Sequence, residues 1–192
     1  MGLGKFSEFS AARFRKALGG ALDAVRERKI KSLVIGLTLE DIADASPYYT
    51  ARHSSELVSA ATYVFDEMKS KRESRPARPS KVTLLASTRK AANQAKLGAL
   101  HGDAIGQGAS LAKDLGNLPP NVCTPTHLAR VARKQADKIR NLETQVLSEA
   151  QIRKLGMGSF LSVTGGTEEP AKLIVMHYRG ATRQKPYVLV GK

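Results

Sequence analysis

The stretch that most constrains the fold is Asp114–Leu128, which reads D-L-G-N-L-P-P-N-V-C-T-P-T-H-L. It holds a glycine, a Pro-Pro pair and a third proline, so we expect no helix or strand to run through it. Thr124 followed by Pro125 predicts the N-cap and first residue of a new helix, because the N–H that proline lacks is not needed there. The sequence therefore predicts a stiff elbow between two structured halves.

Short apolar runs alternate with amphipathic segments before this elbow. Ser32–Leu37 and Lys81–Ala86 are typical of short strands, and the first is expected to be buried in a parallel sheet. Apolar residues at i, i+3 and i+4 spacing predict helices over about Ser7–Arg28, Ala51–Ser70 and Ala91–Leu115. This alternation indicates an α/β sheet.

The helical periodicity also predicts which side chains face the core. In chain order they are Phe14, Leu18, Ala21, Leu22 and Val25; Leu57, Ala61, Val64, Phe65 and Met68; and Leu97, Leu100, Ala104, Leu111 and Leu115. The third helix also contains Gly98, Gly102, Gly106 and Gly108. Because each glycine costs about 1 kcal/mol relative to alanine, we expect close neighbours to hold this helix in place.

The second half is again predicted to be α/β. A helix follows the elbow to about Arg140, with Leu128, Val131, Ala132, Ala136 and Ile139 on its apolar side and Arg130, Arg133, Lys134 and Lys138 on its outer face. The remaining elements are expected to be strands at Thr144–Leu147, Leu173–Tyr178 and Tyr187–Val190, a short helix around Glu149–Leu155 and an apolar piece at Ser159–Thr164.

The chain carries a large positive charge. Its 31 Lys and Arg outnumber 17 Asp and Glu, for a net charge of +14, which favours polyanions. Much of the surplus lies in Lys69–Lys81 and Arg130–Arg140. The first cluster predicts a phosphate-contacting arm through Lys71, Arg72, Arg75 and Arg78, although such runs are more often solvated loops. The plainer explanation of the net charge is a chain whose acidic half lies elsewhere.

The remaining composition predicts a soluble cytoplasmic protein that does not enter a membrane. A single cysteine, Cys123, excludes an internal disulfide and favours a reducing compartment. No apolar run approaches the ~20 residues of a membrane helix, and the N-terminus lacks the apolar core of a secretory signal. Cys123 and His127 have a spacing that can bind metal within one helix, but Pro125 places the cysteine before the cap.

Two motifs carry a family resemblance. K-D-L-G-N-L-P-P-N at Lys113–Asn121 and Y-V-L-V-G-K at Tyr187–Lys192 resemble the leucyl (cytosol) aminopeptidases, the M17 metallopeptidases. In that family (A/K)-x-D-L-x-N-x-P-P-N opens the catalytic domain, and V-L-V-G-K-G-x-x-F-D-(S/T)-G-G begins the metal site. The resemblance is strongest from Lys113 onward and extends back to about Gly2.

The resemblance implies three parts. Residues 1–88 would form an incomplete N-terminal α/β domain resembling a macrodomain, residues 89–114 a connecting helix, and residues 115–192 the incomplete start of the catalytic domain. It also implies a parent enzyme that assembles as a hexamer and releases N-terminal amino acids from peptides.

The same resemblance implies a metal role for Lys192. In the family this lysine is an amine ligand to one of two divalent ions, Mn or Zn. The carboxylate ligands and the catalytic Lys and Arg follow the motif, so no catalytic residue is expected in this sequence and the chain alone is expected to be inactive.

Two other functions stay open. One is a basic α/β module that binds nucleic acid, in its own right or as a second role of the peptidase. The other is ADP-ribose binding by the macrodomain-like fold, which no Gly-rich phosphate loop supports. The G-x-x-x-x-G-K pattern also fails at the C-terminal Gly-Lys, because Pro186 stands where its first glycine belongs.

Overall fold

The structure is a computed structural model that describes residues 3, 5–25, 28, 30–39, 42, 45–71, 79–181 and 183–191. Its contacts divide the chain into two compact units, Met1–Asn117 and Leu118–Lys192. Both combine helices with a small sheet, so the predicted α/β class is confirmed. The finer boundaries at residues 88 and 114 stay a prediction. Among the described residues, no helix is both long and apolar enough to cross a membrane.

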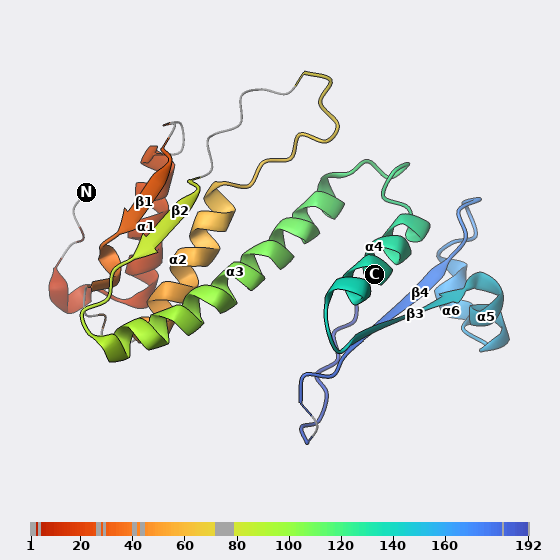
Figure 1. Ribbon diagram of the computed structural model, residues 1–192. Helices are drawn as coiled ribbons and strands as arrows, with labels where there is room; N and C mark the ends of the chain where they lie inside the picture. Colours follow the sequence, from red (N-terminus) through yellow and green to blue (C-terminus); the bar gives the residue numbers. More distant parts are fainter. Residues whose placement is uncertain are drawn as a thin grey trace. The chain divides into compact units, whose positions relative to one another are not determined.

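Unit 1 combines three helices with a two-stranded parallel sheet, and α3 runs alongside α2 (Figure 1). Its elements are the 3-10 turn η1 (Phe6–Glu8), α1 (Ala11–Val25), β1 (Ser32–Ile35), the 3-10 turn η2 (Leu37–Leu39), α2 (Pro47–Ala61), β2 (Lys81–Leu84) and α3 (Arg89–Asn117). β1 pairs with β2 from Ser32 opposite Lys81 to Ile35 opposite Leu84. The two predicted strands before the elbow are therefore present.

The core of unit 1 forms between α1 and β1. Phe14, Leu18 and Leu22 are buried with Ile35 in one cluster, which confirms most of the predicted face. Ala21 is exposed because it lies one residue off the four-residue row of these side chains. The prediction that β1 is buried throughout is wrong. Alternate side chains point to opposite faces, so Leu33 and Ile35 face the core while Val34 is 60% exposed.

Helix α2 begins and ends earlier than predicted. The side chain of Ser46 caps it by accepting a hydrogen bond from the Tyr49 N–H at 3.3 Å, and Pro47 occupies the first turn. The sequence analysis did not predict this Ser-Pro start and placed the beginning of the helix at about Ala51. Because the helix ends at Ala61, three residues predicted on its apolar face lie beyond it: Val64, Phe65 and Met68.

Helix α3 packs on α2 through a stripe of glycines. Gly98, Gly102 and Gly106 are its buried residues. A Cβ atom at Gly98 or Gly102 would collide with the backbone carbonyl of Tyr48 or Arg52. The expected close packing is confirmed, because the two backbones meet where side chains are absent.

The predicted leucine stripe of α3 is wrong. Leu97 is 51% exposed and Leu100 is 60% exposed, and Ala104 is exposed as well. Leu111 and Leu115 are only half-buried. The glycine row takes the place of the leucine row on the α2 side because it permits closer backbone approach than leucine does.

A buried histidine lies on the other side of α2. His53 is 4% exposed. Its Nδ1 lies 2.9 Å from Oε2 of Glu56, and its Nε2 lies 3.2 Å from Nη2 of Arg52. Burial is the largest cause that lowers the pKa of His53; Glu56 opposes this shift, and Arg15 and Arg52 add to it.

Unit 2 begins with the elbow, which is shorter than predicted. Helix α3 runs on to Asn117 and α4 (Pro125–Lys138) begins at Pro125, so the break without a helix or strand is limited to residues 118–124. The predicted cap is confirmed, since Oγ1 of Thr124 accepts from the His127 N–H at 3.3 Å. The elements after it are β3 (Leu142–Ser148), α5 (Glu149–Lys154), α6 (Gly158–Ser162) and β4 (Lys172–Tyr178).

Strands β3 and β4 form an antiparallel pair from Leu142 opposite Tyr178 to Ser148 opposite Lys172. Helix α4 approaches β3 closely, and Oγ1 of Thr144 donates to the Ala132 carbonyl at 3.3 Å. Small residues make this approach feasible: Ala129 and Ala132 are buried. The prediction that Leu128 and Ile139 face inward is wrong, because they are 36% and 43% exposed.

The predicted strand at Tyr187–Val190 is also wrong. This segment has no strand assignment, and exposure of its side chains runs from 77% at Val188 to 96% at Tyr187 and Leu189. Its composition favours a strand, but a strand needs a hydrogen-bonded neighbour. None of the strands in the described ranges pairs with it.

The glycine stripe predicts opposite effects of one substitution at two sites of α3. Gly102→Ala should lower the free energy of unfolding by roughly 1–3 kcal/mol, because the new methyl group collides with a backbone carbonyl. Gly108→Ala is the matched control: nothing lies within 4 Å of its added Cβ, so the gain in helix propensity should stabilise unit 1 by about 0.5–1 kcal/mol. Urea titrations measure both, and stabilisation by Gly102→Ala would contradict the close packing.

The buried His53 predicts a loss of stability in acid. A lowered pKa means that folding favours the neutral ring, so the stabilisation is complete above the ordinary pKa of about 6.5 and is lost as pH falls below it. Unfolding measured from about pH 7.5 to about pH 5 should therefore show a smaller fall for His53→Gln than for the wild type. The same change at exposed His177 is the control, and equal falls for His53→Gln and the wild type would refute the assignment.

Candidate functional site

The residues predicted to bind metal or phosphate fall mostly outside the described part of the chain. Lys192, the expected metal ligand, is one of these, and so are three of the four phosphate-binding candidates: Arg72, Arg75 and Arg78. Lys71 is described and exposed. The metal role of Lys192 and the phosphate contacts of the basic arm therefore stay predictions.

The basic outer face of α4 is present as predicted. Its four cations are all exposed: Arg130, Arg133, Lys134 and Lys138. They lie on the solvent side because Ala129 and Ala132 turn the opposite side of the helix inward. One arginine also has a local partner, since Nη2 of Arg130 lies 2.9 Å from Nδ1 of His127.

Cys123 and His127 each have an ordinary structural environment. Cys123 is half-buried and has a free thiol. The His127 ring is engaged with Arg130. Across the described ranges, no group of three or more His, Cys, Asp or Glu side chains is arranged to hold a metal ion.

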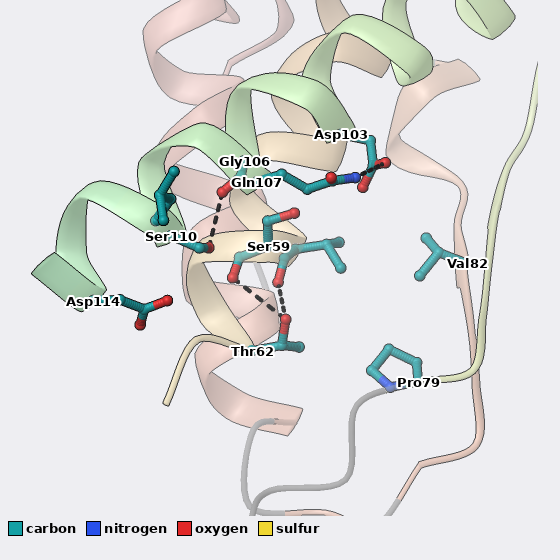
Figure 2. Close-up of a pocket in the computed structure, with 11 residues that line it drawn as sticks. Ser59, Thr62, Pro79, Val82, Asp103, Gly106, Gln107, Ser110 and Asp114 are labelled. Atoms are coloured by element: carbon teal, nitrogen blue, oxygen red, sulfur yellow. Dashed lines mark hydrogen bonds between the residues drawn. The ribbon is translucent and has the colours of Figure 1, made fainter. Parts of the chain in front are cut away.

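Unit 1 contains a cavity of about 600 Å³ beside the α2–α3 pair (Figure 2). Pro79 and Val82 close one side of it. The polar residues of its lining come from the end of α2 with its C-cap and from α3: Ser59, Thr62, Asp103, Gln107, Ser110 and Asp114.

The polar groups of this cavity are largely bonded to one another or to the backbone. Nε2 of Gln107 donates to Oδ2 of Asp103 at 2.7 Å, and the hydroxyls of Ser110 and Thr62 donate to carbonyls of Gly106 and Val58, each at 2.8 Å. Among the described residues that line it, the charged side chains are the carboxylates of Asp103 and Asp114. Their negative charge disfavours a phosphate ligand, and the described lining residues include no cysteine, histidine or lysine.

The sequence analysis missed this cavity and one hydrogen-bond cluster beside it. Oη of Tyr63 donates to Oδ1 of Asp114 at 2.9 Å, and Nδ2 of Asn117 donates to the same Oη at 3.0 Å. Asp114 and Asn117 belong to the K-D-L-G-N motif, whereas Tyr63 lies more than fifty positions earlier. No local pattern in the sequence links them.

Comparison with known proteins explains both halves of the chain. Residues 1–72 match the model of the N-terminal domain of the cytosol aminopeptidase family. Residues 110–192 match the model of the catalytic domain of the same family. The two matches lie in this order along the sequence and together include most of it.

Full-chain relatives agree with this result. A probable cytosol aminopeptidase of Nitrosococcus oceani is 38% identical over 193 residues, which include all of this chain and 38% of the relative. The cytosol aminopeptidase of Pseudomonas aeruginosa is 38% identical over 195 residues, again including the whole chain and 39% of the relative. The chain thus spans less than two fifths of these proteins.

Solved structures show the same fold. The bottromycin maturation enzyme BotP superposes with a TM-score of 0.73 at 26% identity, over 90% of this chain and 35% of BotP. A mutant of tomato leucine aminopeptidase gives a TM-score of 0.73 at 19% identity, over 91% of this chain and 34% of that enzyme, and this likeness concerns the fold alone. With two domain models and full-chain relatives in agreement, the chain belongs to the cytosol aminopeptidase family.

Proposed function

We propose that this chain is part of a metal-dependent leucyl aminopeptidase that releases N-terminal amino acids from peptides. The observation that carries the proposal is the match of one chain to both domains of the cytosol aminopeptidase family, in order. Relatives that bear the name cytosol aminopeptidase support it along the full length of the chain. That name also supports a cytoplasmic location, and a hexamer is proposed from the family resemblance.

The metal part of the proposal rests on Lys192 and on a relative. BotP has been solved in complex with Mn, and that structure superposes with a TM-score of 0.68 at 26% identity. We propose Lys192 as an amine ligand to one of two divalent ions, Mn or Zn. Its ammonium must first lose a proton, because only the neutral amine has a lone pair to donate.

The described residues do not complete such a site. Their carboxylates, histidines and cysteine form no metal-binding group, and Lys192 lies outside the described ranges. In the complete enzyme the ions would polarise the peptide carbonyl and lower the pKa of bound water. We place the remaining ligands, and the catalytic Lys and Arg, after the V-L-V-G-K motif.

We expect the 192-residue chain by itself to be inactive on leucyl peptides, because it holds none of the carboxylate ligands proposed to follow Lys192. The full-length enzyme should hydrolyse them, lose activity to a chelator and regain it with Mn or Zn. Lys192→Ala in the full-length enzyme should weaken metal binding, measured by calorimetry. Chelator-sensitive hydrolysis by the isolated chain would refute the proposal that the remaining metal ligands follow Lys192.

A second role, binding of duplex DNA, is favoured by one observation. The cations of α4 all lie on its solvent side, in a chain of net charge +14. A row of lysines and arginines can neutralise several phosphates without reading base sequence. The arm at Lys69–Lys81 is the other candidate, through Lys71, Arg72, Arg75 and Arg78.

We expect the protein to retain duplex DNA weakly on a filter, with little sequence preference. The logarithm of the affinity should fall by about 0.9 per contacted phosphate for each unit of log salt. Two quadruple alanine variants should show which cluster supplies the contacts. One changes the arm, and the other replaces Arg130, Arg133, Lys134 and Lys138. Peptide hydrolysis by the full-length enzyme should stay unchanged in both. No retention at low salt, or an unaltered slope in both variants, would exclude this role.

A further inference from the structure

Three side chains of unit 1 meet at the end of α3. The Tyr63 hydroxyl donates to Oδ1 of Asp114 at 2.9 Å and accepts from Nδ2 of Asn117 at 3.0 Å. Nζ of Lys113 lies 5.0 Å from the centre of the Tyr63 ring, within the range of a cation–π contact. One tyrosine therefore contacts three residues within the last five positions of the helix.

Tyr63 is itself anchored to α2. It lies two residues after the last residue of that helix, Ala61, and its N–H donates to the Ala60 carbonyl at 3.4 Å. The preceding residue, Thr62, is the C-cap, and its N–H donates to the carbonyls of Ala60 and Val58. The tyrosine thus reaches α3 from a fixed turn.

The last turn of α3 is locally unfavourable for a helix. It contains Asp114, whose negative charge opposes the helix dipole at a C-terminus, and it has no basic residue. It also contains Gly116, which costs about 1 kcal/mol relative to alanine. Leu118 precedes Pro119 and is pushed away from helical geometry. A tertiary contact is needed to hold the helix as far as Asn117.

We propose that Tyr63 is a clamp that fixes where α3 ends, and that Asp114 and Asn117 of the K-D-L-G-N motif bind its hydroxyl. In this role Asp114 and Asn117 position the chain rather than hold metal or peptide. The clamp orders the turn from which the chain leaves unit 1 and enters residues 118–124. The assignment does not depend on the proposed peptidase activity.

The ionisation of Tyr63 agrees with this role. Burial is the largest cause that raises the pKa of Tyr63, and the hydrogen bond to Asp114 acts in the same direction, while the bond from Asn117 opposes them. The hydroxyl therefore keeps its proton at neutral pH and can donate it to the carboxylate.

Hydrogen exchange of the 192-residue chain tests the clamp. Tyr63→Phe removes only the hydroxyl, and amide exchange at residues 114–117 should rise by about fivefold to tenfold, the effect of one or two net hydrogen bonds. Tyr48→Phe is the matched control. Oη of Tyr48 lies 2.9 Å from Nδ1 of His101, so this variant loses a tyrosine hydrogen bond of the same length to α3, away from the end of that helix.

Three further variants separate the clamp from general loosening. Asn117→Ala changes an exposed residue and should accelerate exchange at 114–116, whereas Asp114→Asn, which keeps an acceptor oxygen, should do so less than Asp114→Ala. In all of them exchange at Gly102 and Gly106 should stay as in the wild type. Unchanged exchange at 114–117 in Tyr63→Phe, or an equal rise in Tyr48→Phe, would overturn the proposal.

Discussion

The backbone contact between α2 and α3 is the constraint on which unit 1 depends. Gly98, Gly102 and Gly106 let the two helices approach until a single added methyl group at either of the first two would meet a carbonyl. A helix rich in glycine is weak alone, so α3 is stable as a helix because α2 lies against it. The contact also sets the rotation of α3, and this rotation turns Asp103 toward the cavity and Asp114 toward Tyr63.

Local signals in the sequence predicted local structure well. The Thr124-Pro125 start of α4, the outward basic face of that helix and the strands of both units were all readable from caps, spacing and short apolar runs. Periodicity failed where two rows competed for one face of α3. The leucines of α3 follow helical spacing as well as the glycines do, and hydrophobicity alone predicts that Leu97 and Leu100 are buried. The glycines are buried instead, because they allow the two helix backbones to come close together.

The functional part was less predictable for a similar reason. The family could be inferred from two motifs, but the cavity and the Tyr63 cluster join positions far apart in the sequence, and no spacing rule links them. In the proposed clamp, the motif residues Asp114 and Asn117 have a structural role rather than a catalytic one. Both residues bind the hydroxyl of Tyr63 at the end of α3, and all three lie within unit 1.

Nuclear Overhauser effects measured on the isotope-labelled chain test the central contact most directly. The account predicts cross-peaks between the Hα protons of Gly102 and the Hβ protons of Ser55, whose Cβ lies 2.9 Å from the position of an added Gly102 Cβ. It also predicts that the methyl groups of Leu97 and Leu100 show no contacts to α2. Cross-peaks from those methyl groups to α2, with none from Gly102, would mean that leucines rather than glycines form the interface and would contradict the account.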